Sequence, residues 1–94
     1  MTSSPTNNNQ IFTDSQTKII LSYQNTDEEI TQITISRRSG VFYGTVHKSS
    51  GQLIEQKILE YAKKVDDIRK PLKLTKDKGV KIWQNLTELK KLMK

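Results

Sequence analysis

The chain has 94 residues, a formal net charge of +6 and no cysteine. This length suits one domain, since a single hydrophobic core typically organises on the order of 100–150 residues. The lack of cysteine excludes disulfides and thiolate-bound metals. Because only 33% of the residues are hydrophobic, the core should be thin. We therefore expect a partner to supplement it: a second copy, another subunit or a polyanion.

No targeting or membrane segment is evident. The first ten residues lack the basic and apolar regions of a secretory signal. The longest uninterrupted apolar run, Ile19-Ile20-Leu21, is far shorter than the roughly 20 residues that a membrane span needs. We expect an intracellular protein, cytoplasmic or nuclear, with no membrane partner.

The N-terminal stretch is rich in Ser, Thr, Asn, Gln and Pro and has little to bury. Such a composition predicts a disordered tail over residues 1–17. The folded domain is then expected to comprise residues 18–94.

Three β-favouring segments follow this tail. Residues 18–23 alternate apolar and polar side chains, residues 30–36 place two isoleucines two apart, and residues 41–47 alternate again. The segments 24–27 and 37–40 contain the Asn, Asp and Gly residues that are typical of turns. The pattern predicts a three-stranded antiparallel meander.

The apolar period changes after His47. Ser49 and Gln52 fit a capping box, in which each side chain bonds the backbone N–H of the other residue. Apolar residues between Ile54 and Leu72 then recur every three or four positions, which predicts a helix. Because a proline at position 71 cannot lie inside a helix, this helix should end near Arg69.

A second helix is predicted to begin after Thr75, a good N-cap residue. Its apolar residues Ile82, Leu86, Leu89 and Met93 are again three or four positions apart. The predicted fold is an α+β domain in which a three-stranded antiparallel meander precedes two C-terminal helices.

Residues with catalytic potential are few. His47 is the only histidine, and the glycines are too dispersed to form a phosphate-binding loop. The adjacent carboxylates of Asp66 and Asp67 point about 100° apart on a helix, so they cannot face each other as an acid/base pair. We predict no enzymatic activity, no cofactor, no metal and no small-molecule substrate.

Charge is unevenly distributed along the chain. Residues 1–36 hold one basic and four acidic residues, whereas residues 37–94 hold fifteen basic and six acidic residues. Clustered cations neutralise phosphates, so the pattern predicts salt-sensitive contact with RNA or single-stranded DNA. An equally open interpretation is a solvated lysine-rich surface of the kind that AT-rich coding favours. The predicted contact residues are Arg37, Arg38, Lys63, Lys64, Arg69, Lys70, Lys73, Lys76, Lys78 and Lys81.

Three aromatic residues are candidates for interaction. Phe42 and Tyr43 follow the Arg37-Arg38 turn and could stack on bases. Trp83 is either the largest side chain of the core or an interface anchor. We therefore predict a small non-enzymatic module that binds nucleic acid. The alternative is an adaptor subunit that docks on another protein through its sheet edge or its amphipathic helices.

Overall fold

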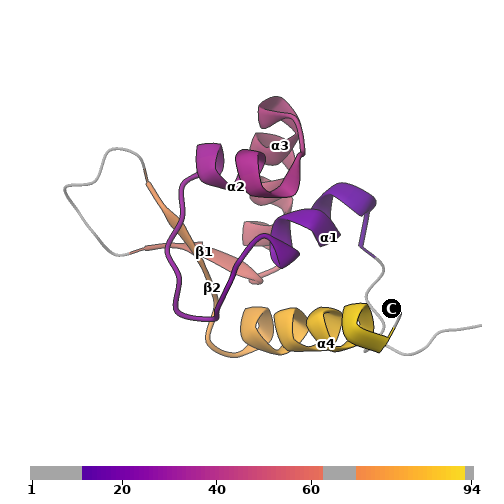
Figure 1. Cartoon of the computed structure of the whole chain (residues 1–94). Coiled ribbons are helices and arrows are strands. Elements are labelled where there is room, and N and C mark those ends of the chain that lie inside the picture. Colours follow the sequence, from indigo (N-terminus) through magenta and orange to yellow (C-terminus); the bar gives the residue numbers. More distant parts are fainter. Residues whose placement is uncertain (1–11, 63–69, 93–94) are drawn as a thin grey trace, which may run out of the picture.

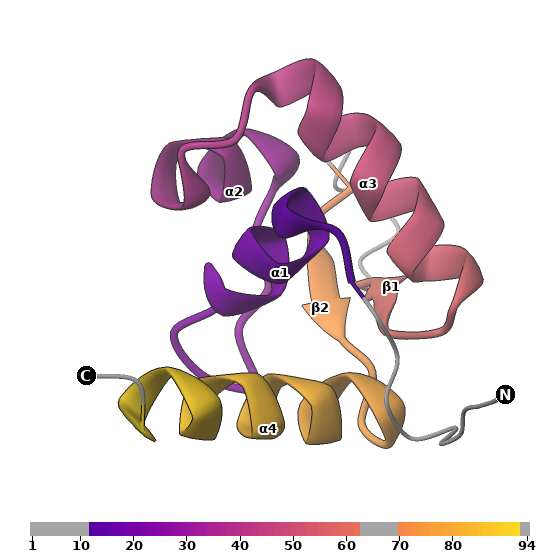
Figure 2. The ribbon, with the colours of Figure 1, turned by 90° about the vertical axis from the view of Figure 1, so that its right-hand side faces the viewer.

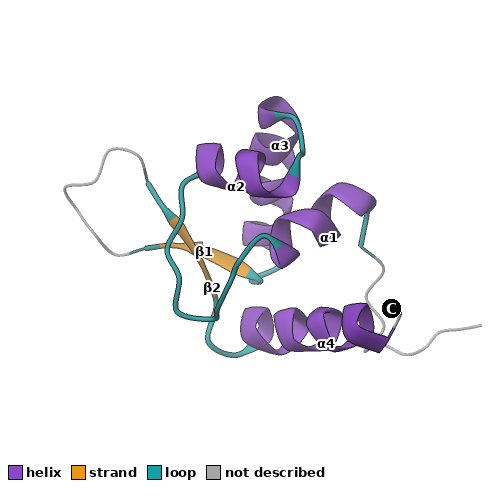
Figure 3. Ribbon diagram, in the orientation of Figure 1, coloured by secondary structure: helices purple, strands orange, loops and turns teal. Residues whose placement is uncertain are grey.

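The computed structural model describes residues 12–62 and 70–92, which form four helices and a two-stranded hairpin. Helix α1 contacts α2 and α3 on one side and α4 on the other (Figures 1 and 2), while the hairpin projects beside α3 (Figure 3). In chain order the elements are α1 (Asp14–Leu21), α2 (Gln32–Ser39), α3 (Tyr43–Glu55), β1 (Leu59–Tyr61), β2 (Leu72–Leu74) and α4 (Lys78–Leu92).

The predicted first strand, residues 18–23, is wrong, because most of this segment belongs to α1. The Thr13 hydroxyl accepts from the Gln16 N–H (3.1 Å), and the Gln16 Oε1 accepts from the Thr13 N–H (3.0 Å). This capping box starts the helix at Asp14, inside the stretch predicted as a tail. Ile19 and Ile20 are both fully buried, which a strand with one core-facing side would not allow. Residues 1–11 of the predicted tail lie outside the described residues.

The predicted second strand, residues 30–36, is also wrong beyond its first residue. Ile30 forms an isolated antiparallel bridge with Leu72, and α2 begins directly afterwards. The hydroxyl of Thr31 accepts from a backbone N–H of the first turn (3.3 Å). Gly40 ends the helix in a left-handed conformation with φ of 73°. Core burial of Ile35 outweighs the weak β-preference of this isoleucine-rich segment.

The predicted third strand, residues 41–47, instead enters α3. The buried residues of this helix, Val46, Ser49, Ser50 and Leu53, recur at helical spacing. Ser49, predicted to cap a later helix, therefore lies in the interior of α3. Two of the four core-facing residues are serines, so hydrophobicity alone gives only a faint helical pattern.

The predicted helix from Ile54 to Arg69 is wrong as well, because α3 ends at Glu55. Lys57 adopts a left-handed φ of 65°, its N–H donates to the Ile54 carbonyl (3.0 Å), and the Ile58 N–H donates to the Leu53 carbonyl (2.9 Å). These two bonds form a Schellman motif, which terminates a helix. The chain then turns into β1, and residues 63–69 of the predicted helix lie outside the described residues.

The β-hairpin replaces this predicted helix. Strand β1 pairs with β2 in antiparallel register, with Leu59 opposite Leu74 and Tyr61 opposite Leu72. The three leucines are buried, whereas Tyr61 is half-exposed. The predicted meander of three strands followed by two helices is therefore incorrect; two antiparallel strands follow three helices instead.

The last predicted helix agrees with the structure as α4. The Thr75 hydroxyl accepts from the Gly79 N–H (2.7 Å) and donates to the Lys57 carbonyl (2.7 Å), so it also joins the helix to the end of α3. Gly79 is buried, and a Cβ there would overlap the carbonyl oxygen of Ile58. The start of α4 therefore requires the small residue.

Tyr23 joins three parts of the fold. Its hydroxyl donates to the Leu72 carbonyl (2.8 Å), and its own carbonyl accepts from the Trp83 indole N–H (2.9 Å). The side chain is buried, and burial raises the pKa of the phenol far above its ordinary value, so the hydroxyl remains a donor. Tyr23 thus positions both β2 and α4 against the end of α1.

Removing the Tyr23 hydroxyl should weaken the fold. We expect Tyr23→Phe to lower the free energy of unfolding by about 0.5–1.5 kcal/mol, as for a typical buried hydrogen bond. Urea denaturation measures the change. The control is Tyr43→Phe, whose half-exposed phenol should change stability by less than about 0.5 kcal/mol. Equal stabilities of Tyr23→Phe and wild type would contradict the role of this bond.

Two helical glycines should respond oppositely to alanine. At Gly79 the added Cβ meets the Ile58 carbonyl, so Gly79→Ala should destabilise by about 1–3 kcal/mol. At Gly51 an added Cβ meets no atom within 4 Å, so Gly51→Ala should stabilise by about 0.5–1 kcal/mol. Urea denaturation of the two variants measures both changes, and effects of the same sign would contradict this packing of α4.

Candidate nucleic-acid interface

Helices α2 and α3 form a helix-turn-helix. The turn Gly40-Val41-Phe42 connects them, with the left-handed Gly40 reversing the chain and the buried Val41 fixing the turn to the core. A turn of about 3–4 residues that often contains glycine is typical of this motif. The hairpin follows α3, so the second helix of the motif lies beside β1.

An open groove of about 380 Å³ lies where these elements meet. The start of α2 forms one wall, the first half of α3 a second, and the hairpin a third. The groove combines hydroxyl, amide, imidazole and ammonium groups with one exposed isoleucine. Its lining residues are Thr31, Gln32, Ile33, Tyr43, His47, Tyr61 and Lys70.

The exposed residues of α3 share one face. Their spacing of three or four places them opposite the buried Val46 and Leu53. Gly44 and Gly51 add no side chain to this face. The exposed residues of the helix are Tyr43, Gly44, His47, Lys48, Gly51 and Glu55.

His47 connects the two helices of the motif. Its Nδ1 lies 3.2 Å from the Oε1 of Gln32, in the first turn of α2. Both residues line the groove. The alternating pattern of residues 41–47 predicts His47 at the end of a strand, whereas the structure places it in α3.

Two of the predicted contact aromatics lie at the start of α3. Phe42 is 80% exposed and Tyr43 is 49% exposed. The Phe42 ring lies over Gly44, where an added Cβ would come within 3.3 Å of it. Both side chains are thus exposed at the N-terminus of α3, and not in a strand as the sequence indicated.

Trp83 serves the core. It is partly buried against the hydrophobic cluster, and its indole N–H donates to the Tyr23 carbonyl. The side chain thus packs against the core from the surface, and the interface role expected from the sequence remains a prediction.

The two predicted contact arginines differ. Arg37 is exposed in the last turn of α2. The Nη1 of Arg38 lies 2.8 Å from the Glu28 carboxylate and donates to the Ser22 carbonyl (3.2 Å). The hydrogen bond from Arg38 holds the pKa of Glu28 below its usual value. Arg38 therefore joins α2 to the segment that precedes it.

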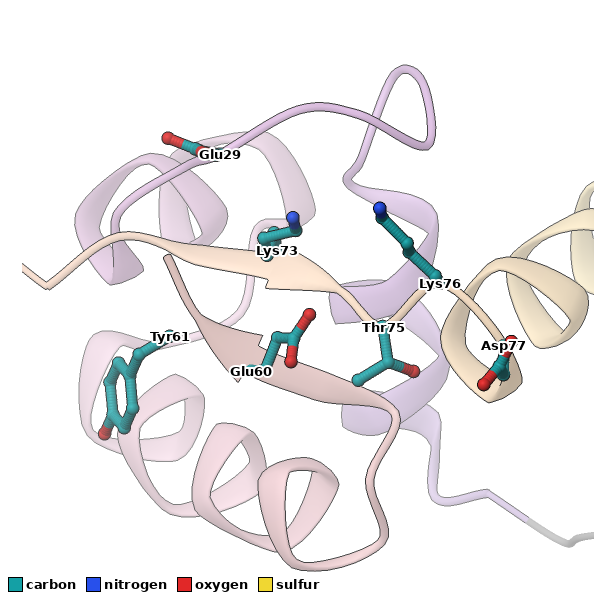
Figure 4. Close-up of a pocket in the computed structure, with 7 residues that line it drawn as sticks. All are labelled: Glu29, Glu60, Tyr61, Lys73, Thr75, Lys76 and Asp77. Carbon is teal, nitrogen blue, oxygen red and sulfur yellow. The ribbon is translucent and has the colours of Figure 1, made fainter. Parts of the chain in front are cut away.

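The predicted lysine cluster is divided between separate surfaces. Lys70 lines the groove beside α3, whereas Lys73 and Lys76 line a second cleft of about 650 Å³. Figure 4 shows Lys73, Lys76 and Glu60 around this cleft, with Glu60 and Lys73 on paired positions of the two strands. Two further acidic residues, Glu29 and Asp77, line the same cleft. This mixed charge gives the second cleft little attraction for a polyanion.

The remaining predicted lysines have other locations. Lys78 and Lys81 are exposed on α4. Lys63, Lys64 and Arg69 lie outside the described residues. Among the residues that the structure describes, no group of three or more His, Asp or Glu residues could hold a metal ion. Within the same residues, no helix has the length and apolar character needed to cross a membrane.

Comparison with known proteins identifies the fold. No protein-family model matches the sequence, and no curated protein is significantly similar to it. Among solved structures, MepR of Staphylococcus aureus superposes with a TM-score of 0.68 at 22% identity, over 88% of this chain and 60% of that one. ZitR of Lactococcus lactis superposes with a TM-score of 0.70 at 18% identity, over 97% and 60%. The fold is a winged helix of the MarR type.

A third solved structure supports this winged helix. MarR of Staphylococcus aureus, in complex with salicylate and kanamycin, superposes with a TM-score of 0.62 at 28% identity, over 88% of this chain and 55% of that one. The present chain thus spans between 55% and 60% of the three solved chains. In this winged helix, α3 is the second helix of the helix-turn-helix and the β1–β2 hairpin is the wing.

The Glu28–Arg38 ion pair should make stability depend on acid. The pKa of Glu28 is lowered in the folded state, so its contribution is present above the ordinary glutamate pKa of 4.5 and is lost as pH falls through the folded value. We expect Glu28→Gln to lower the melting temperature at neutral pH, with a difference that shrinks below pH 4.5. Thermal unfolding between pH 3 and pH 7 measures this, with Glu55→Gln as an exposed control. A difference that stays constant over this range would contradict the assignment.

Proposed function

We propose that this chain binds double-stranded DNA, with α3 in the major groove and the wing against the flanking backbone. The supporting observation is a helix-turn-helix whose second helix turns a polar face to solvent beside the wing. In DNA-binding proteins with this motif, the second helix enters the major groove. The major groove of B-DNA, about 12 Å wide, admits a helix, whereas that of A-form RNA is too narrow for side chains to read. Duplex DNA thus replaces the RNA or single-stranded DNA predicted from the sequence.

The residues of α3 favour insertion by its N-terminal half. Phe42 and Tyr43 offer apolar surface to thymine methyl groups and to sugars, and His47 offers hydrogen bonds to base edges. Lys48 supplies a positive charge for a phosphate. At the other end, the Glu55 carboxylate is exposed and would repel the DNA backbone. The helix therefore approaches DNA most closely at its first turns.

The wing side of the groove supplies Lys70 and Tyr61. Lys70 is exposed and borders the groove on the side of the wing. It can bind a backbone phosphate when α3 lies in the major groove of the duplex. The contacts predicted for Lys63, Lys64 and Arg69 remain predictions from the sequence. The likeness to MepR, MarR and ZitR supports the winged-helix geometry. Because it covers only part of those chains, it leaves the oligomeric state and any small ligand to experiment.

Contact with a protein partner is a second candidate, and a specific feature of α4 favours it. Leu89 is 54% exposed and Leu92 is 75% exposed in the last turns of this helix. Figures 1 and 2 both show α4 on the side of α1 away from α2 and α3. A partner that binds α4 would therefore leave the DNA-binding face accessible, so the two functions are compatible.

The DNA proposal makes a quantitative prediction about salt. Each lysine–phosphate contact releases counterions, so Lys48→Gln and Lys70→Gln should each reduce the slope of log K against log salt by about 1. Fluorescence anisotropy with a labelled duplex between about 50 and 200 mM salt measures this slope. Lys91→Gln, an identical change on α4, should leave the slope unchanged.

Two outcomes would overturn the proposal. The first is an absence of binding to any duplex at about 50 mM salt, where phosphate-driven affinity is strong. The second is an equal loss of slope in all three variants, because charge alone would then govern binding irrespective of its location. Preference for single-stranded DNA or RNA over duplex would support the original sequence prediction instead.

A further inference from the structure

We infer that His47 selects the DNA sequence that this chain recognises and that Gln32 is its positioning residue. The inference rests on the proposed function. It begins from the contact between the two side chains, one on each helix of the helix-turn-helix, within the groove beside the wing. The contact fixes which hydrogen-bonding group His47 presents to DNA.

The bond to Gln32 determines the tautomer of the imidazole. The Oε1 of Gln32 is a carbonyl oxygen and can only accept, so the Nδ1 of His47, at 3.2 Å, must carry the proton and donate. In neutral imidazole the other nitrogen, Nε2, is then an acceptor. The contact between the two side chains therefore presents one oriented acceptor, the Nε2 of His47, to DNA.

This acceptor is complementary to amino-bearing bases. In the major groove adenine offers the N6 amino group as donor and N7 as acceptor, and cytosine offers the N4 amino group as donor. The Nε2 of His47 can accept from either amino group. Guanine and thymine present acceptors where His47 also accepts, so they leave its lone pair unpaired. We expect a preference for adenine or cytosine at one position of one strand.

Several other residues of α3 are less suited to this role. Gly44 and Gly51 have no side chain, and the long ammonium chain of Lys48 fits a phosphate better than one base edge. The amide of Gln52 is engaged inside the protein, where its Oε1 accepts from Gln16 (2.8 Å). His47 is thus the exposed side chain of α3 that combines a hydrogen-bonding ring with a fixed orientation.

The test is selection of duplexes from a randomised library by wild type and variants, followed by sequencing. Wild type should enrich adenine or cytosine at one position, and His47→Ala should reduce that preference about tenfold or more, since a good base contact supplies about that discrimination. His47→Gln retains an acceptor and should restore part of the preference. Gln84→Ala, which removes an exposed amide from α4, should select the wild-type sequence.

Gln32→Met tests the positioning role. This variant keeps the length of the side chain but removes the acceptor for Nδ1, so the preference should weaken at the same position that His47→Ala affects. Gln84→Ala should keep affinity for random-sequence DNA at low salt within about twofold of wild type, because that affinity comes from phosphate contacts and Gln84 lies on α4. Circular dichroism checks that each variant keeps its helical content.

The outcomes separate the two proposals. If wild type binds no duplex, the proposed function fails. If wild type binds DNA without sequence preference, or if His47→Ala selects the wild-type sequence unchanged, the role of His47 is overturned while DNA binding stands. If Gln32→Met alters a different position from His47→Ala, Gln32 reads a base itself and its positioning role is wrong.

Discussion

The hydrogen bond from Tyr23 to Leu72 is the contact on which the arrangement of this small fold depends. Leu72 also contacts two other segments. Its N–H donates to the Ile30 carbonyl (2.8 Å), and its carbonyl accepts from the Ile30 N–H (3.0 Å). Within the wing, Leu72 lies opposite Tyr61. The Tyr23 carbonyl in turn accepts from Trp83 on α4. One residue just after α1 thus positions the wing through its side chain and the last helix through its main-chain carbonyl. Since the wing is one wall of the groove beside α3, the shape of the candidate DNA surface follows from a contact within the core.

Helix α3 has a low intrinsic helix propensity and is held in place by packing against the core. Gly44 and Gly51 each reduce helix stability by about 1 kcal/mol relative to alanine, and the buried Ser50 hydroxyl has no hydrogen-bond partner in the described structure. Packing of Val46 and Leu53 against the core compensates, because both are fully buried. The face turned to solvent therefore contains two glycines without loss of the helix. Under the proposed function, the two glycines would allow closer approach to the floor of a DNA groove, although they lower the stability of the helix.

The sequence predicted α4, but not the helical character of the first half of the chain. One local signal is present in the sequence: Thr13 and Gln16 fit a capping box, although the surrounding composition resembles that of a disordered tail. The end of α3 carries no glycine, since Lys57 takes the left-handed position that glycine usually fills. Because the apolar spacing continues past Lys57, it indicates one long helix. In the structure, the buried leucines after Lys57 belong to β1 and β2. Only tertiary contacts distinguish these alternatives, because short isoleucine-rich segments fit a helix or a strand equally well.

The predicted long helix is also the reason why the sequence indicated one basic surface, whereas the structure divides these lysines between separate surfaces. A continuous helix to Arg69 would have brought the lysines around the connection together, whereas the hairpin separates Lys70 from Lys73 and Lys76, which lie in a cleft that also has carboxylates. Among the described residues, the face formed by α3 and the groove carries only Lys48 and Lys70 as cations, with Glu55 opposing them. Few phosphate contacts give a weak sequence-independent affinity. Under the proposed function, base contacts must then supply most of the discrimination between DNA sequences. The groups available for such contacts are the neutral hydrogen-bonding side chains at the start of α2 and on the first turns of α3.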